Sequence, residues 1–149
     1  LHEMAGSTKV IHLHGELTKV RPEDSYTEED GFDESRIKDV NFGPVSIGDK
    51  DDRGVQYRPH IVFFGEAVPK MTDAIAELAE ADFMIIVGTS LVVQPAASLW
   101  KYTPVDCPVF VVDPKDTPID NEEGVVHIKE KATVGVAEAI RMISEMSCE

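Results

Sequence analysis

The chain has 149 residues, of which 42% are hydrophobic and 28% charged, a composition typical of a globular protein with a core of its own. Its formal net charge of −14 argues against binding of nucleic acid, because contacts to phosphates need clustered Lys and Arg. No apolar run reaches the roughly 18–20 residues of a membrane span, and two distant cysteines form no disulfide framework, so we expect a cytoplasmic protein that binds no membrane.

The chain opens with the end of a helix, followed by an apolar run that contains two histidines. We expect a short strand from Lys9 to Leu13, and the stretch VIHLHGEL places His12 and His14 two residues apart. Positions two apart in a strand share one face of the sheet. The pair therefore has three readings: two metal ligands, a catalytic base with a bystander, or two structural histidines bonded to the backbone.

Residues 21–57 are polar and acidic and differ in character from both flanking segments. They contain neither cysteine nor histidine, so a tetrahedral thiolate zinc site cannot form within them. A solvated charged surface is the usual role of such a segment. We therefore predict a small acidic insertion lobe at 21–57, set into a larger part made of residues 1–20 and 58–149.

The rest of the chain alternates helical patterns with apolar runs that suit strands buried on both faces of a sheet. The predicted elements are, in order, a helix at 71–81, strands at 83–87, 108–112 and 124–128, and a helix at 133–146. Strands and helices in alternation are typical of an α/β fold with a parallel sheet.

Two of the predicted strands end in residues suited to a nucleotide. Val87 precedes the sequence GTS at 88–90, and Val112 precedes Asp113. In parallel sheets ligands bind beyond the carboxyl ends of the strands, where a glycine lets the backbone approach a phosphate and a carboxylate accepts from a ribose diol. The same residue types also populate ordinary turns, so a plain turn and a nucleotide site are both open at this point.

Five segments, in this order, resemble the C-terminal part of the catalytic domain of sirtuins, the NAD-dependent protein deacylases. They are LHEMAGS (1–7), VIHLHGEL (10–17), RPHIVFFGE (58–66), ADFMIIVGTSLVVQPAASL (81–99) and VVDPKD (111–116). The resemblance covers nearly the whole chain outside the acidic segment, and its most specific part is PHIVFFGE followed by GTSLVVQPAA. It implies an α/β, Rossmann-like NAD-binding fold and, in the complete polypeptide, NAD-dependent removal of acyl groups from protein lysines.

Carried over position by position, the resemblance implies a role for each matching residue. His14 matches the catalytic base, which leaves His12 as a supporting neighbour on the same face. The residues implied to bind the acyl-lysine peptide are Val62, Phe63, Phe64, Gly65, Glu66 and Val93. The residues implied to bind NAD are Gly88, Thr89, Ser90, Asp113, Pro114, Lys115 and Ala132. Asp113 stands where the family usually has asparagine, and its carboxylate can still accept from a ribose hydroxyl.

The sequence departs from the family in two respects. The glycine-rich first NAD motif and the Gln-Asn-x-Asp motif are absent, so we expect an incomplete Rossmann-like domain that lacks its first half and is inactive in isolation. The paired cysteines of the family's structural zinc module are absent from 21–57, so we expect no zinc and no other metal.

The implied reaction takes NAD and an acylated lysine in a protein or peptide, and yields free lysine, nicotinamide and O-acyl-ADP-ribose. Histidine side chains titrate near neutral pH, which suits them to act as the base in such a step. Two alternatives are open. One is an NAD hydrolase or mono-ADP-ribosyltransferase on the same scaffold, and the other, for the isolated chain, is a non-catalytic fragment that binds acyl-peptide or nucleotide.

Overall fold

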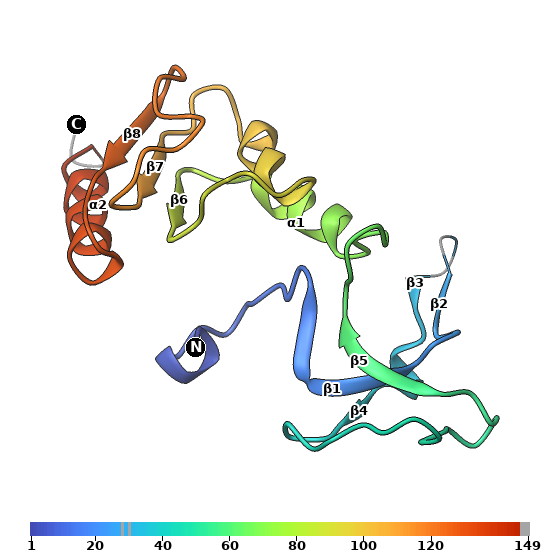
Figure 1. The fold of residues 1–149 in the computed structure, drawn as a ribbon. Helices are drawn as coiled ribbons and strands as arrows, with labels where there is room; N and C mark the ends of the chain where they lie inside the picture. Colours follow the sequence, from blue (N-terminus) through green and yellow to red (C-terminus); the bar gives the residue numbers. More distant parts are fainter. Residues whose placement is uncertain (28, 30, 147–149) are drawn as a thin grey trace. The chain divides into compact units, whose positions relative to one another are not determined.

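A computed structural model describes residues 1–27, 29 and 31–146, and the chain divides into two compact units, Leu1–Thr72 and Asp73–Glu149 (Figure 1). In the described residues, the first unit has a three-stranded and a two-stranded sheet, and the second unit has a three-stranded sheet. The segment 21–57 supplies strands to the first unit, and its standing as a separate lobe stays a prediction. None of the described helices is long and apolar enough to cross a membrane. Cys107 is buried, and Cys148 lies outside the described residues.

The first unit is built on an antiparallel sheet with β1 at its centre. β1 spans Gly15–Pro22 and pairs with β5 (Tyr57–Ile61) on one side and β4 (Lys38–Asp39) on the other. The strand ends at Pro22 because the chain turns there, and the turn is held by Ser25, whose backbone N–H and hydroxyl both donate to the Pro22 carbonyl (3.1 and 2.6 Å). The unit's short elements are η1 (Glu3–Ala5), β2 (Tyr26–Thr27), β3 (Gly31–Phe32) and η2 (Glu34–Arg36).

The strand predicted at Lys9–Leu13 is wrong: these residues form no strand, and the strand begins later, at Gly15. The backbone bonds locally instead. The amide of Leu13 donates to the carbonyl of Ile11, and the amide of Gly15 donates to that of His12, each at 3.0 Å. His12 and His14 therefore lie in the turn that leads into β1, and the argument that they share one face of a strand does not apply.

The second unit is a parallel α/β sheet, as predicted. β6 (Met84–Val87), β7 (Val109–Val112) and β8 (Val125–Ile128) lie side by side in that order, within a residue of the predicted starts and ends. The register pairs Val87 with Val112 and Val112 with Ile128, so all three strands end at the same edge. Figure 1 shows the three arrows together, next to α2 (Ala132–Met146).

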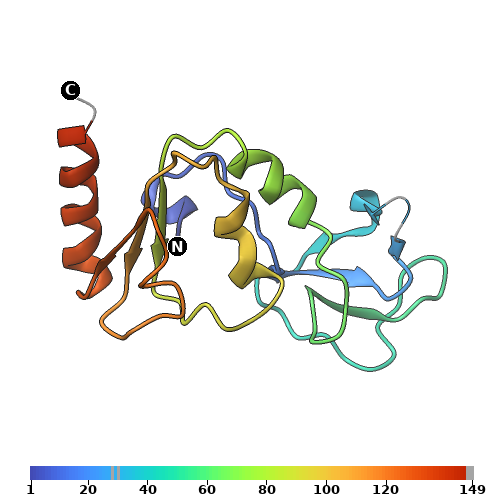
Figure 2. The same ribbon diagram turned by 90° about the horizontal axis from the view of Figure 1, so that it is seen from above.

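Side chains along each strand alternate between the two faces of this sheet, so both faces are apolar. A helix covers each of them. Phe110 and Val112 face α2, where they pack with Ala139 and Ile143. Val109 and Val111 face the other way and belong to a cluster that includes Ile119 and, at its margin, Trp100 of η3 (Ala96–Tyr102). Figure 2 shows α2 along one face of the sheet and η3 toward the other. The remaining helix, α1 (Met71–Leu78), begins where the sequence predicts, ends before the predicted end at residue 81, and crosses the boundary between the units.

Gly135 lets α2 approach the sheet closely, and this contact gives a testable prediction. A Cβ atom at this position would lie 2.5 Å from Cγ1 of Val112, a stiff, fully buried side chain, and 3.2 Å from Cγ2 of Ile128. Gly→Ala in a helix normally stabilises by up to about 1 kcal/mol. Here we expect Gly135→Ala to reduce the free energy of unfolding by about 1–3 kcal/mol, because the core is overpacked.

Chemical denaturation of the two proteins measures this difference. Val134→Ala, on the exposed side of the same helix, is the matched control and should change stability by less than about 0.5 kcal/mol. If Gly135→Ala were more stable than the parent protein, the close packing of α2 on β7 would not be what excludes a larger side chain at this position.

Candidate functional site

In the first unit, the predicted base is joined to the predicted substrate segment through the backbone. His14 is exposed and lies one residue before β1, and its carbonyl accepts a hydrogen bond from the Val62 amide at 3.0 Å. Gly15 pairs with Ile61 directly after this bond. The residue before β1 and the residue after β5 are thus held side by side by the sheet that they flank.

The glycine after His14 is required by the packing of the two strands. Gly15 has φ +90°, a left-handed conformation that L residues rarely adopt. A Cβ atom here would overlap the carbonyl oxygen of His60 and would lie 2.9 Å from the Cα atom of Ile61. The sequence His-Gly therefore places His14 next to a close approach of β1 to β5.

The loop 62–66 is fixed at its base and exposes apolar side chains at its tip. The Glu66 carboxylate accepts from the Phe63 amide at 2.9 Å and from both terminal nitrogens of Arg58 at 2.6 and 3.1 Å. These bonds, with Arg58 the largest contributor, lower the pKa of Glu66 below its usual value. Phe64 is 94% exposed and Phe63 is 48% exposed, so the loop offers two aromatic side chains to a ligand.

In the second unit, the two strand ends singled out in the sequence meet. The Gly88 amide donates to the carbonyl of Val112 at 3.0 Å, so the turn 88–90 lies beside the start of the segment 113–115. Gly88 has φ +62°, and the space where a Cβ would stand is open. The Thr89 hydroxyl accepts from the Leu91 amide at 3.3 Å, which shapes the turn. The other predicted residues of this edge, Ser90, Pro114, Lys115 and Ala132, are exposed, as is Val93 further along the chain.

The segment that begins at Asp113 is held in place by His127, and the sequence does not predict this contact. The Asp113 carboxylate accepts from the Lys115 amide at 2.8 Å, and its backbone carbonyl lies 2.8 Å from Nε2 of His127. The His127 side chain is buried and its Nδ1 lies 2.8 Å from Asp120. The residues around His127 in the sequence do not indicate this contact, because only the pairing of β7 with β8 brings His127 close to Asp113.

The contacts of His12 and His14 bear on the hypothesis that these two histidines bind a metal. Nε2 of His12 lies 2.6 Å from the carboxylate of Glu3 and 3.7 Å from that of Glu16. Within the described part of the chain, His12 and His14 join no group of three metal-ligating side chains. One such group is present, Asp116, Asp120 and His127. Asp116 is paired with Lys129, and Asp120 accepts bonds from Thr117, so these carboxylates already have partners.

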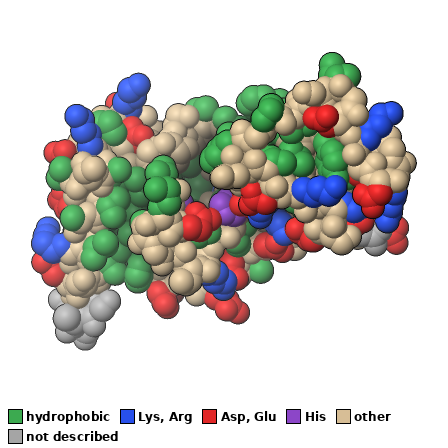
Figure 3. Space-filling model, turned by 90° about the horizontal axis from the view of Figure 1, so that it is seen from below, with side chains coloured by type: hydrophobic (Ala, Val, Ile, Leu, Met, Phe, Trp, Pro, Cys, Tyr) green, Lys and Arg blue, Asp and Glu red, His purple; other side chains and the backbone are tan. Residues whose placement is uncertain are grey.

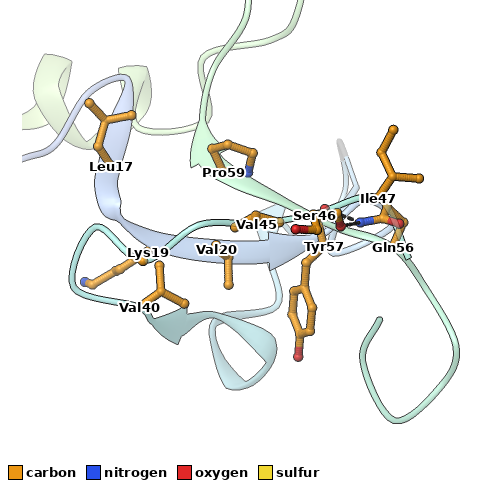
Figure 4. Close-up of a pocket in the computed structure, with 11 residues that line it drawn as sticks. Leu17, Lys19, Val20, Val40, Val45, Ser46, Ile47, Gln56, Tyr57 and Pro59 are labelled. Atoms are coloured by element: carbon orange, nitrogen blue, oxygen red, sulfur yellow. Dashed lines mark hydrogen bonds between the residues drawn. The ribbon is translucent and has the colours of Figure 1, made fainter. Parts of the chain in front are cut away.

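A separate cavity of about 360 Å³ opens on one face of the first unit's sheet (Figure 4). Its lining is mostly apolar and includes Val20, Val40 and Pro59, with Tyr57 and Gln56 at one end. Gln56 steadies the surrounding loop by donating to the carbonyl of Ser46 at 3.0 Å. The cavity contains none of the predicted site residues. Acidic side chains are spread over the face drawn in Figure 3, as expected from the net charge of −14.

Three parallel strands with helices on both faces, and with a glycine turn and a carboxylate at adjacent strand ends, place the second unit in the Rossmann-like class of α/β proteins. Residues 1–95 match the model of the Sir2 family. The chain therefore belongs to the Sir2 family, the sirtuins, and the resemblance seen in its motifs is confirmed.

Relatives of known name and solved structures agree with this assignment. An NAD-dependent protein deacylase of Bacteroides thetaiotaomicron is 39% identical over 145 residues, covering 96% of this chain and 60% of the relative. One of Aggregatibacter actinomycetemcomitans is 46% identical over 114 residues, covering 76% and 50%. The crystal structure of a Sir2 homolog–NAD complex matches 98% of this chain and 55% of its own, with 32% identity and a TM-score of 0.75.

A structure of Sir2Tm bound to a propionylated peptide matches with 29% identity and a TM-score of 0.68, over 99% of this chain and 60% of its own. The chain thus spans between half and about 60% of the length of these relatives. Their names and ligands describe the longer proteins.

Proposed function

We propose that the complete polypeptide removes acyl groups from protein lysines in an NAD-dependent reaction. The observation that carries the proposal is the backbone bond between His14 and Val62, because it holds an exposed imidazole next to a loop that presents two aromatic side chains. Both segments resemble the family's catalytic and substrate motifs and lie within residues 1–95, which match the Sir2 family model, and relatives of this chain are named NAD-dependent protein deacylases.

The second unit suits the binding of NAD. Gly88 leaves open space and an uncrowded backbone at the end of β6, and Asp113 offers a carboxylate at the end of β7. Ribose hydroxyls donate readily to a carboxylate, and phosphates approach glycine turns closely. When bound, NAD supplies the ribose to which the acyl group is transferred, with nicotinamide as the leaving group.

The acyl-lysine peptide is held by the loop 62–66. An extended peptide pairs with strand-like backbone through main-chain bonds, so that substrates of different sequence are accepted. Phe63 and Phe64 are exposed and apolar, and they form suitable walls for an uncharged acyl-lysine side chain. Glu66 and Arg58 fix the loop before substrate arrives, which lowers the entropic cost of binding.

His14 acts as the general base. The acyl transfer requires a ribose hydroxyl to lose its proton, and a neutral imidazole has an unprotonated ring nitrogen that can accept it. No metal is assigned to any step, and the site residues needed for the proton transfer are in the first unit.

The products test the proposal. The complete polypeptide is incubated with NAD and an acetyl-lysine peptide, and the mixture is analysed by mass spectrometry. We expect free-lysine peptide, nicotinamide and O-acetyl-ADP-ribose in equal amounts. Bare ADP-ribose without deacylated peptide would identify an NAD hydrolase, and an ADP-ribosylated protein would identify a transferase. Either result would overturn the deacylase assignment.

A further inference from the structure

Two arginines stand directly opposite each other in the sheet of the first unit. The register of β1 and β5 pairs Arg21 with Arg58. Side chains at directly opposed positions lie on the same face, and like charges in such positions repel. The opposite face carries Val20 and Pro59 and forms the apolar cavity of Figure 4. The arginine pair therefore needs compensating negative charge on its own face.

Within the described residues, only one of the two arginines forms a salt bridge. Arg58 forms a bidentate ion pair with Glu66. Arg21 is just 5% exposed, yet the described part of the chain places no carboxylate within salt-bridge distance of it, and its buried Nε has no hydrogen-bond partner. Its guanidinium lies 5.2 Å above the ring of Phe32. Burial, and secondly the charge of Arg58, lower the pKa of Arg21 and outweigh the opposing charges of Glu66 and Glu23, neither of which forms a salt bridge with it.

The two arginines line a pocket of about 230 Å³ beside the proposed substrate loop. Tyr26 and Phe32 supply aromatic walls, and the pocket is bordered by Val62 and Glu66, the first and last residues of that loop. Glu23 also borders the pocket but is exposed. A buried charge without a partner is costly, so this arrangement suits an anion delivered from outside the chain.

We propose that this pocket binds the carboxylate of an acidic residue in the peptide substrate, near the acyl-lysine. The inference rests on the proposed deacylase function and specifies its substrate class. A guanidinium offers two parallel N–H donors that match a carboxylate, and Arg21 has its donors free of any carboxylate of the described chain. Val62 and Glu66 border the pocket, and a peptide paired along the loop 62–66 advances about 3.3 Å per residue, so we expect a side chain near the acyl-lysine to lie within reach of it.

The test compares acidic peptides with neutral isosteres in the complete polypeptide. Acetyl-lysine peptides carry a single Glu or a single Gln at each of the four positions on either side of the lysine. We expect kcat/KM to be about tenfold higher for Glu than for Gln at one position, the lower end of what a charge-assisted hydrogen bond contributes. The difference should appear in KM. Binding of the same peptides is measured in parallel by fluorescence anisotropy.

Variants then locate the preference. Arg21→Met should reduce the Glu/Gln ratio to about one, and Arg21→Lys should keep part of it because the charge remains. Lys38→Met is the matched control: Lys38 also lies over an aromatic ring of this sheet, 4.9 Å from the Tyr57 centroid, but does not border the pocket. It should keep both the ratio and the basal activity. If Arg21→Met does not fold, the comparison of peptides on the parent protein decides.

Three outcomes are decisive. Equal kcat/KM and equal affinity for Glu and Gln peptides at every position would overturn the inference while the deacylase function stands. A preference that survives in Arg21→Met would also overturn it. A protein that deacylates no peptide but binds Glu peptides more tightly would refute the proposed function and support the pocket.

Discussion

Replacing His14 with alanine is expected to lower kcat for deacylation by roughly 10²–10⁴-fold, the contribution of a general base. His14 is exposed and lies beside Val62, so its removal takes away a proton acceptor without leaving a cavity in the core. The rate is measured with the complete polypeptide at saturating NAD and acetyl-lysine peptide. Peptide affinity, measured by fluorescence anisotropy, should stay within about threefold, because the loop 62–66 is unchanged.

His12→Ala is the matched control for this experiment. His12 is the neighbouring histidine, but it pairs with Glu3 and Glu16 at the surface of the turn. Exposed ion pairs contribute little to stability, so we expect kcat to fall by less than about threefold. If His14→Ala keeps its activity, the base is a residue other than His14, and if His12→Ala loses as much as His14→Ala, the experiment does not single out His14 as the base.

Replacing Gly15 with alanine should have the largest effect on the stability of the first unit. The new Cβ would overlap the His60 carbonyl oxygen, which belongs to the backbone of β5 and has little freedom to move. The substitution also forces alanine to φ +90°. We expect a loss of about 3 kcal/mol or more in the free energy of unfolding, measured by chemical denaturation, from strain and overpacking together.

Gly54→Ala separates these two causes. Gly54 lies in the same unit at φ +81°, but no atom stands within 4 Å of its Cβ position. It should therefore lose only about 1–2 kcal/mol, the cost of the left-handed conformation. Equal losses in the two variants would show that the close approach of β1 to β5 adds nothing, and that the backbone conformation alone selects glycine after His14.

Local patterns in the sequence were sufficient to predict the second unit. The strands at 83–87, 108–112 and 124–128 were recognised because each is a short apolar run, and α2 was recognised from apolar residues at helical spacing. The turn after Val87 and the carboxylate after Val112 were expected at one edge, and the bond from Gly88 to Val112 places them together. Parallel strands in one sheet end at a common edge, so chain order was enough to predict this neighbourhood.

The first unit shows where local patterns fail. The apolar run Lys9–Leu13 resembles a strand, but its backbone bonds within a turn, and no pattern of hydrophobicity distinguishes the two. Within the polar segment 21–57, β4 pairs with β1, and the sequence did not predict this strand; the standing of the segment as a lobe of its own stays a prediction. Short strands of two residues leave too weak a periodicity to be recognised.

By itself, the sequence identified the family through the resemblance of its motifs. It also determined the parallel sheet and the chemical types available at its strand ends, because these depend on the spacing of residues along the chain. The tertiary structure alone decided which distant residues face each other. The antiparallel pairing of β1 with β5 places Arg21 directly opposite Arg58. The parallel pairing of β7 with β8 places His127 within hydrogen-bond distance of the Asp113 carbonyl. Strand register is set by contacts between residues far apart in the chain, so neither juxtaposition leaves a local signal.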